Sequence, residues 1–550
     1  MILTGAQILI EELVKNGADT IFGYPGGAVL DIYDELYKNS DRIEHILSAH
    51  EQGAAHAADG YARVTGKPGV VIATSGPGAT NLVTGIANAY LDSVPMVAFT
   101  GNVAEQMLGK DSFQEVDIIG ITQPIVKHSY IARNVEDLAG MITEAFALAN
   151  SGRKGPVVID IPKSTQRATC EYNPDLHFRV QRKLPVPDFT EAVKAIQESK
   201  RPYIYAGGGV LAAGATEEVE ELSRKISAPI GLSLMGLTAI PDSYMLNLGM
   251  TGMHGRVSSI TAQSEADLVI AVGVRFSDRA TGNVEEYRKN CKVIHVDIDE
   301  AEMGKNVPGI IELLGDAKKT LQGLIKALDP IRNDEWMDRC LENKYLDFSL
   351  DNDEQFIAKN IIGCINRHVK PETVVATDVG QHQMWVMQHY KFEKPRTLLS
   401  SGGLGTMGYG FGAAIGGCVA SDRKPTVLFT GDGSFGMNLN EMATAVSQKL
   451  PIVIVLFNNG TLGMVRQWQR TFYENRYSST TLARKTDFPL LAKAFGADGC
   501  TVYNLEELEA CLAAGLPEDG PFLIECMIDI DDKVLPMIPP GGSFGDIMLD

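Results

Sequence analysis

The chain has 550 residues, 45% of them hydrophobic, and a formal net charge of −20. This length corresponds to roughly three or four globular domains. The negative charge argues against nucleic acid and against an anionic membrane surface as partners, because both attract basic patches. No apolar run approaches the roughly 20 residues that span a bilayer, so we expect no membrane segment.

The chain enters a predicted helix at once, with a capping box at Thr4 and Gln7 and a stop at Asn16 and Gly17. Because this start has no features of a signal or transit peptide, we expect a cytoplasmic protein. The eight cysteines contain no C-x-x-C pair, and a chain of this size does not need disulfides to be stable. We therefore expect reduced, buried thiols.

Residues 1–165 alternate apolar strands with helical stretches, which predicts a parallel sheet covered by helices. Glycine-rich turns follow two of these strands, at Tyr24–Gly27 and Thr74–Gly78, and are candidate ligand loops. The stretch "TSGPGATN" from Thr74 lacks the Gly-Lys-Ser/Thr ending of a nucleotide phosphate loop, so we reject a nucleotidase. The clearest predicted strands are Thr20–Tyr24, Val70–Thr74, Met96–Thr100 and Val157–Ile161.

Glu51 opens a predicted helix rich in small residues, in "SAHEQGAAHAADGYAR" (Ser48–Arg63). An acidic residue in the first turn is favoured by the helix dipole alone. From these residues by themselves, that structural role and a functional role for Glu51 are about equally well supported.

An extended, proline-containing linker is predicted at Gln181–Asp188, followed by a second domain at residues 189–328. Gly207–Gly209 follow its first strand but miss the G-x-G-x-x-G spacing of dinucleotide sites. Asp297 and Asp299 end a later strand, where they would either accept ribose hydroxyls or be surface acids. Its predicted strands are Tyr203–Ala206, Pro229–Ser233, Leu268–Val272 and Val293–Val296.

A charged stretch at Asp329–Glu354 is predicted to be helix and linker, and a third domain spans residues 357–540. It has the same alternation of strands and helices as the first. The fold class is therefore α/β, with three doubly wound parallel-sheet domains. The predicted strands of the third domain are Val374–Thr377, Thr397–Leu399, Val427–Phe429, Pro451–Phe457 and Phe522–Cys526.

Two of these strands enclose the most informative stretch, Pro425–Gln467. Gly431-Asp432-Gly433 ends the first strand, and Asn458-Asn459 ends the second. Carboxylate, amide and phosphate oxygens suit magnesium, and a helix amino terminus favours phosphate, so the stretch predicts a metal-diphosphate cradle. Gly-Asp-Gly alone is only a common turn. The crossover is predicted to be one helix whose sheet-facing residues are Leu439, Met442, Ala443, Val446 and Leu450.

The order Gly-Asp-Gly, crossover helix, strand and Asn-Asn resembles the motif of thiamine diphosphate-dependent enzymes. The resemblance implies that Asp432, Asn459 and the main-chain carbonyl of Thr461 bind Mg²⁺. Within these enzymes the whole chain is similar to the large catalytic subunits of the acetohydroxyacid (acetolactate) synthases. The motifs that carry this similarity are "FGYPGGAVLDIYD", "HEQGAAHAADGYAR", "TSGPGATN", "FQEVD", "VRFSDRATG", "DVGQHQMW", "GGLGTMGYGFGAAIG", "GDGSFGMNLNE" and "NNGTLGMVRQWQ".

The resemblance implies that pyruvate is decarboxylated on thiamine diphosphate and joined to a second 2-ketoacid, pyruvate or 2-ketobutyrate, in isoleucine and valine biosynthesis. It implies Mg²⁺, a structural FAD in the central domain, a homodimer or homotetramer, and a small regulatory subunit. The amino-terminal domain would bind the pyrimidine, and the carboxy-terminal domain the diphosphate and Mg²⁺.

The resemblance also assigns roles to single residues. Glu51 would be the catalytic acid/base on the aminopyrimidine, and Trp468 would line the pocket of the second ketoacid. Gln114, Lys163, Phe113 and Gly27 would line the substrate channel. The cofactor-binding residues would be Pro77, Asn81, Met253, His254, Arg275, Asp278, Arg279, Asp297, Gly380, Gln381, His382, Gly405, Met407, Gly431, Gly433, Ser434 and Met464.

Ser277 and Ala280 depart from the family's usual "RFDDRVTG" in the segment that accompanies flavin binding, whereas Asp278 and Arg279 are retained. Three alternatives remain at this point. They are a pyruvate oxidase on the same scaffold, a catabolic acetolactate synthase without flavin, and a cofactor-binding relic without activity. Trp468 and the Arg-Phe-x-Asp-Arg segment favour the biosynthetic synthase over the oxidase, and intact Glu51, Asp432 and Asn459 argue against the relic.

Overall fold

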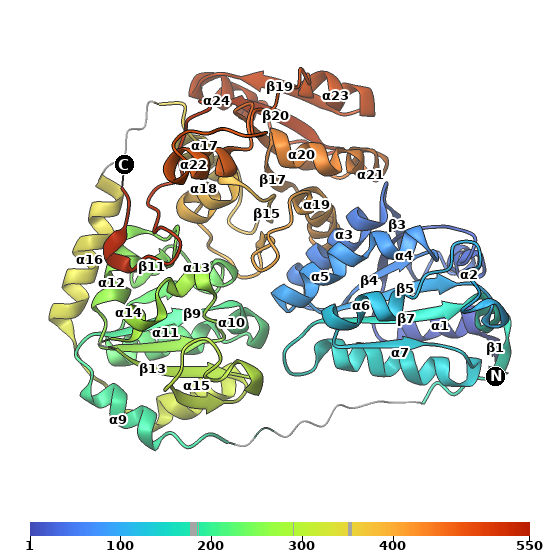
Figure 1. The fold of residues 1–550 in the computed structure, drawn as a ribbon, viewed down its shortest axis with the longest axis horizontal. Coiled ribbons are helices and arrows are strands. Elements are labelled where there is room, and N and C mark those ends of the chain that lie inside the picture. Colours follow the sequence, from blue (N-terminus) through green and yellow to red (C-terminus); the bar gives the residue numbers. More distant parts are fainter. Residues whose placement is uncertain (176–183, 185, 290, 350–354, 550) are drawn as a thin grey trace.

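Three six-stranded sheets, each parallel throughout and flanked by helices, organise the chain (Figure 1). The structure is a computed structural model that describes residues 1–175, 184, 186–289, 291–349 and 355–549. The predicted α/β fold class with three doubly wound domains is confirmed. Of the predicted linker Gln181–Asp188, residues 181–183 and 185 lie outside the described residues. None of the helices in the described ranges has both the length and the apolar character of a membrane span.

The first sheet has the strand order β3-β2-β4-β5-β7-β6. Its four central strands are those predicted, whereas β3 and β6 at the edges were not predicted. The strands are β2 (Thr20–Tyr24), β3 (Glu44–Leu47), β4 (Gly69–Ala73), β5 (Met96–Asn102), β6 (His128–Ile131) and β7 (Pro156–Pro162). The helices are α1 (Gly5–Lys15), α2 (Leu30–Lys38), α3 (Glu51–Thr65), α4 (Pro77–Asn81), α5 (Val83–Asp92), α6 (Ile118–Thr122), α7 (Val135–Asn150) and α8 (Lys163–Arg167).

The amino terminus differs from the prediction in one respect. A short strand, β1 (Ile2–Thr4), precedes α1 and pairs antiparallel with β8 (Thr169–Glu171). The prediction that the chain enters a helix at once is therefore wrong, because the first residues extend to reach this partner. The capping box between Thr4 and Gln7 is confirmed, and α1 ends at Lys15 with Asn16 as its C-cap, where the stop was predicted.

The second sheet has the order β11-β10-β9-β12-β13-β14, which is the strand order 3-2-1-4-5-6 of dinucleotide-binding domains. The strands β11 and β14 were not predicted. The strands are β9 (Pro202–Ala206), β10 (Ile230–Leu232), β11 (Asn247–Met250), β12 (Leu268–Val272), β13 (Lys292–Asp297) and β14 (Ile311–Leu314). The helices are α9 (Thr190–Glu198), α10 (Gly208–Ala213), α11 (Thr216–Ile226), α12 (Val257–Glu265), α13 (Asp278–Thr281), α14 (Val284–Arg288) and α15 (Ala317–Ala327).

The charged stretch after the second domain contains the predicted helix, α16 (Asp334–Ser349), which packs on α12. Residues 350–354 of that stretch lie outside the described residues. The third sheet follows, with the order β16-β15-β17-β18-β20-β19. Its strands are β15 (Val375–Thr377), β16 (Leu398–Leu399), β17 (Thr426–Gly431), β18 (Ile452–Asn458), β19 (Asp498–Val502), which was not predicted, and β20 (Phe522–Met527).

The helices of the third domain include a crossover between β17 and β18 that is not the single helix predicted. A 3₁₀ turn at Leu439–Glu441 divides it into two helices. Because of this turn, the residues after it that face the core are not those expected for one continuous helix. Ala443 is consequently exposed, whereas Ala445 is buried. The helices are α17 (Ala358–His368), α18 (Gln381–His389), α19 (Tyr409–Ala420), α20 (Asp432–Asn438), α21 (Met442–Ser447), α22 (Gly463–Phe472), α23 (Phe488–Phe495) and α24 (Leu505–Ala513).

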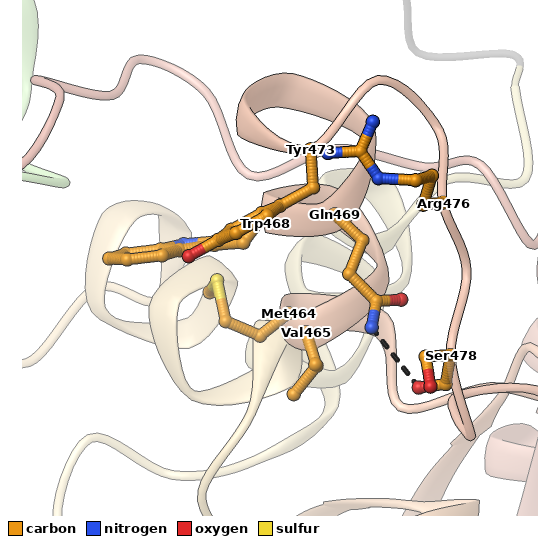
Figure 2. A pocket seen from close by; sticks show the side chains of 7 residues that line it. All are labelled: Met464, Val465, Trp468, Gln469, Tyr473, Arg476 and Ser478. Carbon is orange, nitrogen blue, oxygen red and sulfur yellow. Dashed lines mark hydrogen bonds between the residues drawn. The ribbon is translucent and has the colours of Figure 1, made fainter.

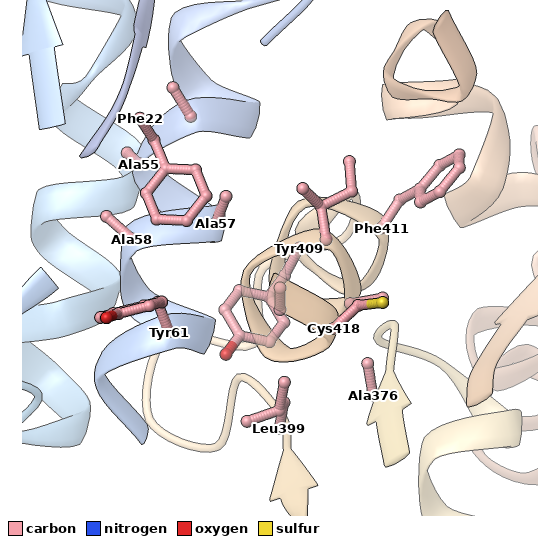
Figure 3. Packing of buried hydrophobic residues seen from close by; sticks show 14 of the residues in the cluster. Phe22, Ala55, Ala57, Ala58, Tyr61, Ala376, Leu399, Tyr409, Phe411 and Cys418 are labelled. Atoms are coloured by element: carbon pink, nitrogen blue, oxygen red, sulfur yellow. The ribbon is translucent and has the colours of Figure 1, made fainter. Parts of the chain in front are cut away.

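Helices α3 and α19 join the first and third domains through a shared hydrophobic core (Figure 3). Their facing residues are glycine and alanine, so the two backbones approach closely. A methyl group at Gly60 would overlap the carbonyl of Ala413, and one at Gly416 would overlap the carbonyl of Ala57. The small-residue pattern of the segment from Glu51 thus serves close helix packing.

The end of the chain returns to the second domain (Figure 1). The main-chain N–H of Ile538 donates a hydrogen bond to Met253 O, and that of Asn283 donates to Gly542 O. The rings of Phe544 and Tyr287 are also in contact. The terminal segment therefore ties the second and third domains together.

The α3–α19 packing predicts that Gly416→Ala destabilises the protein, because the added methyl group has no space beside Ala57. We expect a loss of about 1–3 kcal/mol in the free energy of unfolding, measured by chemical denaturation. Gly363→Ala in α17 is the matched control, since its new methyl group would meet only Arg367 at 3.8 Å. That control should gain about 0.5–1 kcal/mol from helix propensity. Equal effects of the two variants would contradict the packing argument.

Candidate active site

The residues assigned to the pyrimidine site gather where the strands of the first sheet end. Glu51 is the first residue of α3, directly after β3, and Pro77 begins α4, directly after β4. The side chain of Asn81 donates a hydrogen bond from Nδ2 to Glu51 Oε2 at 2.9 Å. Glu51 is only half-buried. Its carboxylate is therefore held in place by Asn81 while one side remains open.

The residues assigned to the substrate channel lie at the same edge of the first sheet. Lys163 Nζ donates to the carbonyl of Gly27 at 2.9 Å, which brings two of them together. Gln114 has a positive φ of 59°, and its backbone packs against Gly76 of the glycine-rich turn. Phe113 is 87% exposed, so its ring is not packed into the hydrophobic core of this chain.

The residues assigned to the diphosphate and the metal line one narrow cleft in the third domain. They come from the segments that follow β15, β16, β17 and β18, on both sides of the point where the strand order reverses. Open parallel sheets bind their ligands at this point. Gly405 is not part of the lining, although Met407 is. The predicted residues in the cleft are Gly380, Gln381, His382, Met407, Gly431, Asp432, Gly433, Ser434, Asn459, Thr461 and Met464.

The oxygen atoms in this cleft have the chemistry of a magnesium site. Asp432 is buried, and this burial raises the pKa of its carboxyl group to about 6. The main-chain N–H of Thr461 donates to Asn459 Oδ1 at 3.2 Å. On either side of Thr461, the carbonyl of Gly460 accepts a hydrogen bond from Leu482 N–H and the N–H of Leu462 donates to Thr480 O. In such an antiparallel pair the carbonyl of Thr461 points away from the segment that contains Thr481.

His382 has hydrogen-bonding capacity that the described residues do not use. Its Nε2 is buried without a partner among them, and burial lowers the pKa of the ring to about 3, so the imidazole is neutral. A buried polar atom without a partner is costly unless a ligand or water satisfies it. The cleft therefore fits a polar ligand beside the carboxylate of Asp432.

A hydrogen-bonded network that the sequence did not reveal holds Asn459. Gln381 accepts a bond from Asn459 Nδ2 at 3.3 Å and donates to Gln467 Oε1 at 3.0 Å and to Asp532 O at 2.7 Å. Gln467 lies inside the motif "NNGTLGMVRQWQ", but no spacing rule relates it to Gln381. Only the fold shows this contact.

Asp378 is another positioning residue that was not predicted. It is buried, and its Oδ1 accepts hydrogen bonds from the main-chain N–H groups of Val379 and Gly408, both at 2.8 Å. These bonds hold the turn before Gly380 beside the turn that carries Met407. Its position directly after a strand, in "DVGQ", is the sequence feature that could have pointed to Asp378 as a site residue.

Trp468 lines a second cavity of about 520 Å³ with residues on both sides of it in the chain (Figure 2). The guanidinium of Arg279, from the second domain, lies over the indole at 5.4 Å from the ring centre. Arg279 Nη1 also contacts Met253 Sδ at 3.6 Å. One of the residues assigned to flavin binding, Arg279, therefore meets the residue assigned to substrate selection, and a second, Met253, contacts Arg279. The cavity is lined by Met464, Val465, Trp468, Gln469, Tyr473, Arg476 and Ser478.

The other residues assigned to flavin binding lie around the edge of the second sheet. Asp297 ends β13, and burial raises the pKa of its carboxyl group to about 6. Arg275 is half-buried, which lowers the pKa of its guanidinium. His254 has a buried Nδ1 without a partner in the described part of the chain, and burial lowers the pKa of its ring to about 4. Asp278 is exposed.

The carboxylate site of the first domain and the cleft of the third domain are separate in one chain, since the cleft is lined by third-domain residues only. Glu441, at the end of the 3₁₀ turn in the crossover, links them. Its carboxylate accepts hydrogen bonds from the main-chain N–H groups of Ala49 and His50, at 3.2 and 3.0 Å. The turn that leads to Glu51 is thus anchored to the crossover that begins at Asp432.

Comparison with known protein families agrees with this architecture. Three models of thiamine pyrophosphate enzymes match the chain: the N-terminal TPP binding domain at residues 3–121, the central domain at residues 189–324, and the C-terminal TPP binding domain at residues 378–526. Thiamine pyrophosphate is the same compound as thiamine diphosphate.

Several curated proteins are similar over nearly the whole chain. The acetolactate synthase large subunit of Corynebacterium glutamicum is 44% identical, covering 99% of this chain and 90% of that protein. The acetolactate synthase isozyme 2 large subunit of Escherichia coli is 43% identical, covering 99% of both chains. The acetolactate synthase large subunit of Lactococcus lactis is 43% identical, covering 98% of this chain and 95% of that protein. The chain therefore belongs to the thiamine diphosphate-dependent enzymes, in the family of acetolactate synthase large subunits.

Proposed function

We propose that this protein is an acetolactate synthase that decarboxylates pyruvate and joins the remaining two-carbon unit to a second 2-ketoacid. The observation that carries the proposal is the oxygen-lined cleft around Asp432 and Asn459, in a chain that also holds a carboxylate, Glu51, at the corresponding edge of another domain. Bound thiamine diphosphate supplies the electron sink that a 2-ketoacid needs to lose carbon dioxide.

The cleft supplies the groups that would hold the cofactor. The carboxylate of Asp432, the side-chain oxygen of Asn459 and the carbonyl of Thr461 would bind Mg²⁺, which in turn would bind the diphosphate. Gln381 and its network keep the amide of Asn459 in place. Met407 lies in the cleft lining, where its bulky side chain would support the bent form of the cofactor.

Glu51 would exchange a proton with the aminopyrimidine ring, as a general acid/base. Asn81 orients the carboxylate through the 2.9 Å hydrogen bond to Oε2 and leaves Oε1 for the cofactor. Because Glu51 and the cleft are separate in one chain, we propose a homodimer or a dimer of dimers. In it, Glu51 of one protomer completes the cleft of the other.

The remaining roles follow the same reasoning. Lys163, Gly27, Gln114 and Phe113 would line the path of the 2-ketoacids, with pyruvate or 2-ketobutyrate as the second substrate. The second domain, with its dinucleotide-type strand order, would bind a structural FAD near Arg275 and Asp297. The large-subunit names of the relatives support a small regulatory partner. We further propose that the protein acts in the cytoplasm, in isoleucine and valine biosynthesis.

The decisive experiment is incubation of the purified protein with pyruvate, thiamine diphosphate and Mg²⁺, followed by an assay of acetolactate and a flavin absorption spectrum. Acetolactate together with a flavin spectrum is expected. Acetyl phosphate or hydrogen peroxide in place of acetolactate would favour a pyruvate oxidase, and acetolactate without flavin would favour a catabolic synthase.

Glu51→Gln should lose turnover by about 100-fold or more, because general acid–base groups contribute roughly 10²–10⁴-fold to rates. The variant keeps the size of the side chain, so the affinity for thiamine diphosphate, measured by calorimetry, should change little. Near-normal turnover would remove Glu51 from the catalytic step.

Asp432→Asn should weaken binding of thiamine diphosphate in the presence of Mg²⁺ by about tenfold or more, because the metal loses its anionic ligand. Calorimetric titration with and without Mg²⁺ measures this effect independently of turnover. Asp519→Asn, at an exposed surface position, is the matched control. An unchanged, Mg²⁺-dependent affinity in Asp432→Asn would refute its role as a ligand.

Trp468→Leu should reduce the preference for 2-ketobutyrate by about tenfold, since pocket contacts of this kind are worth roughly 1–3 kcal/mol. The ratio of the two products from mixed pyruvate and 2-ketobutyrate measures the preference. Phe472→Leu, which alters the ring packed on Trp468 at 5.6 Å between centres, is the control. A product ratio that Trp468→Leu leaves unaltered would count against a role for Trp468 in selecting the second ketoacid.

A further inference from the structure

Four of the eight cysteines gather in one part of the third domain. Cys364 lies on α17, Cys500 on β19, Cys511 on α24 and Cys526 on β20, and these thiols perturb one another's ionisation. Cys364 and Cys526 are buried, whereas Cys500 and Cys511 are only partly buried. Small reagents can therefore reach the second pair.

Cys500 and Cys511 are in direct contact. Their Sγ atoms are 3.1 Å apart, because α24 packs on β19, the strand at the edge of the third sheet. A disulfide requires the sulfur atoms at about 2 Å, so a movement of about 1 Å closes the bond. The two residues lie on elements joined by a short connection, Tyr503 and Asn504, which holds them near each other.

The two thiols differ in pKa. The hydrogen bond between them stabilises the thiolate of Cys511, which lowers its pKa and raises that of Cys500. Burial raises the pKa of the Cys364 thiol to about 12 and also raises that of Cys526. Since the thiolate is the nucleophile in thiol–disulfide exchange, Cys511 is the attacking group of this cluster and Cys500 the second thiol.

We propose that Cys500 and Cys511 form a reversible redox modification site that closes to a disulfide in the presence of a small-molecule disulfide. The thiolate of Cys511 attacks one sulfur of the oxidant, whose S–S bond breaks and releases one thiolate. Cys500 then loses its proton and attacks the sulfur of Cys511, which releases the second thiolate. The two protein thiols are oxidised to one disulfide, and the oxidant is reduced to two thiols.

The test uses the full-length protein and oxidised glutathione, followed by alkylation of the free thiols and mass spectrometry. A protease that cleaves after glutamate separates the two cysteines, because Glu506, Glu507 and Glu509 lie between them. We expect a linked pair of peptides containing Cys500 and Cys511, and a fall from eight to six free thiols (8 − 2) that dithiothreitol reverses. Alkylation of both cysteines after oxidation would overturn the proposal.

Two single variants test the order of the steps. In Cys500→Ser the serine hydroxyl still donates a hydrogen bond to Cys511, so Cys511 should be trapped as a mixed disulfide with glutathione. In Cys511→Ser, Cys500 should stay free. Cys291→Ser, another partly buried cysteine, is the control and should still form the Cys500–Cys511 link. A mixed disulfide on Cys500 but not on Cys511 would overturn the assignment of the attacking thiol.

Discussion

The close packing of α3 on α19 is the constraint on which the arrangement of the chemistry depends. Glycine and alanine at the crossing let the two backbones touch, as at Gly60 and Gly416. Glu51 is the first residue of α3, and Met407 stands in the turn that leads into α19. The same contact therefore fixes the position of Glu51 relative to the turn that carries Met407 within one chain.

Polar groups buried along this contact make its geometry specific. The hydroxyl of Tyr409, on α19, donates to Asp59 Oδ1 at 2.7 Å, and Arg63 of α3 binds the same carboxylate at 2.6 Å. Asp59 and Arg63 lie on the same helix, so the hydrogen bond from Tyr409 is the one that crosses the contact, and it gives the buried hydroxyl of α19 a defined acceptor on α3. Glu441 adds a second point of attachment next to Glu51.

The first and third domains share one sheet topology but place different functional groups at its edge. Counted along the chain, both have the strand order 2-1-3-4-6-5, so both open a crevice where the order reverses. Only the loops at that crevice differ. The first domain places Glu51 and Asn81 there, and the third places Asp432 and Asn459.

Much of this fold could be predicted from hydrophobic patterns, because the central strands are short apolar runs buried on both faces. The edge strands β3, β6 and β19 could not, since their residues are half-exposed and mixed in polarity. The exposed Ala443 was misplaced for a different reason. A 3₁₀ turn inside the crossover changes which residues after it face the core, and no residue pattern in that segment predicts such a turn.

Some contacts of the candidate site could likewise be predicted from neighbouring residues in the sequence, and others could not. Asp432 and Asn459 lie at the two ends of one crossover, so a motif was enough to pair them. Arg279 and Trp468 come from different domains, and only the fold brings the guanidinium over the indole. The second domain thus places a cation against the ring of the residue proposed to select the second ketoacid. In the proposed reaction, which has no net redox change, this contact would link the central domain to the substrate pocket, besides the proposed structural role of FAD.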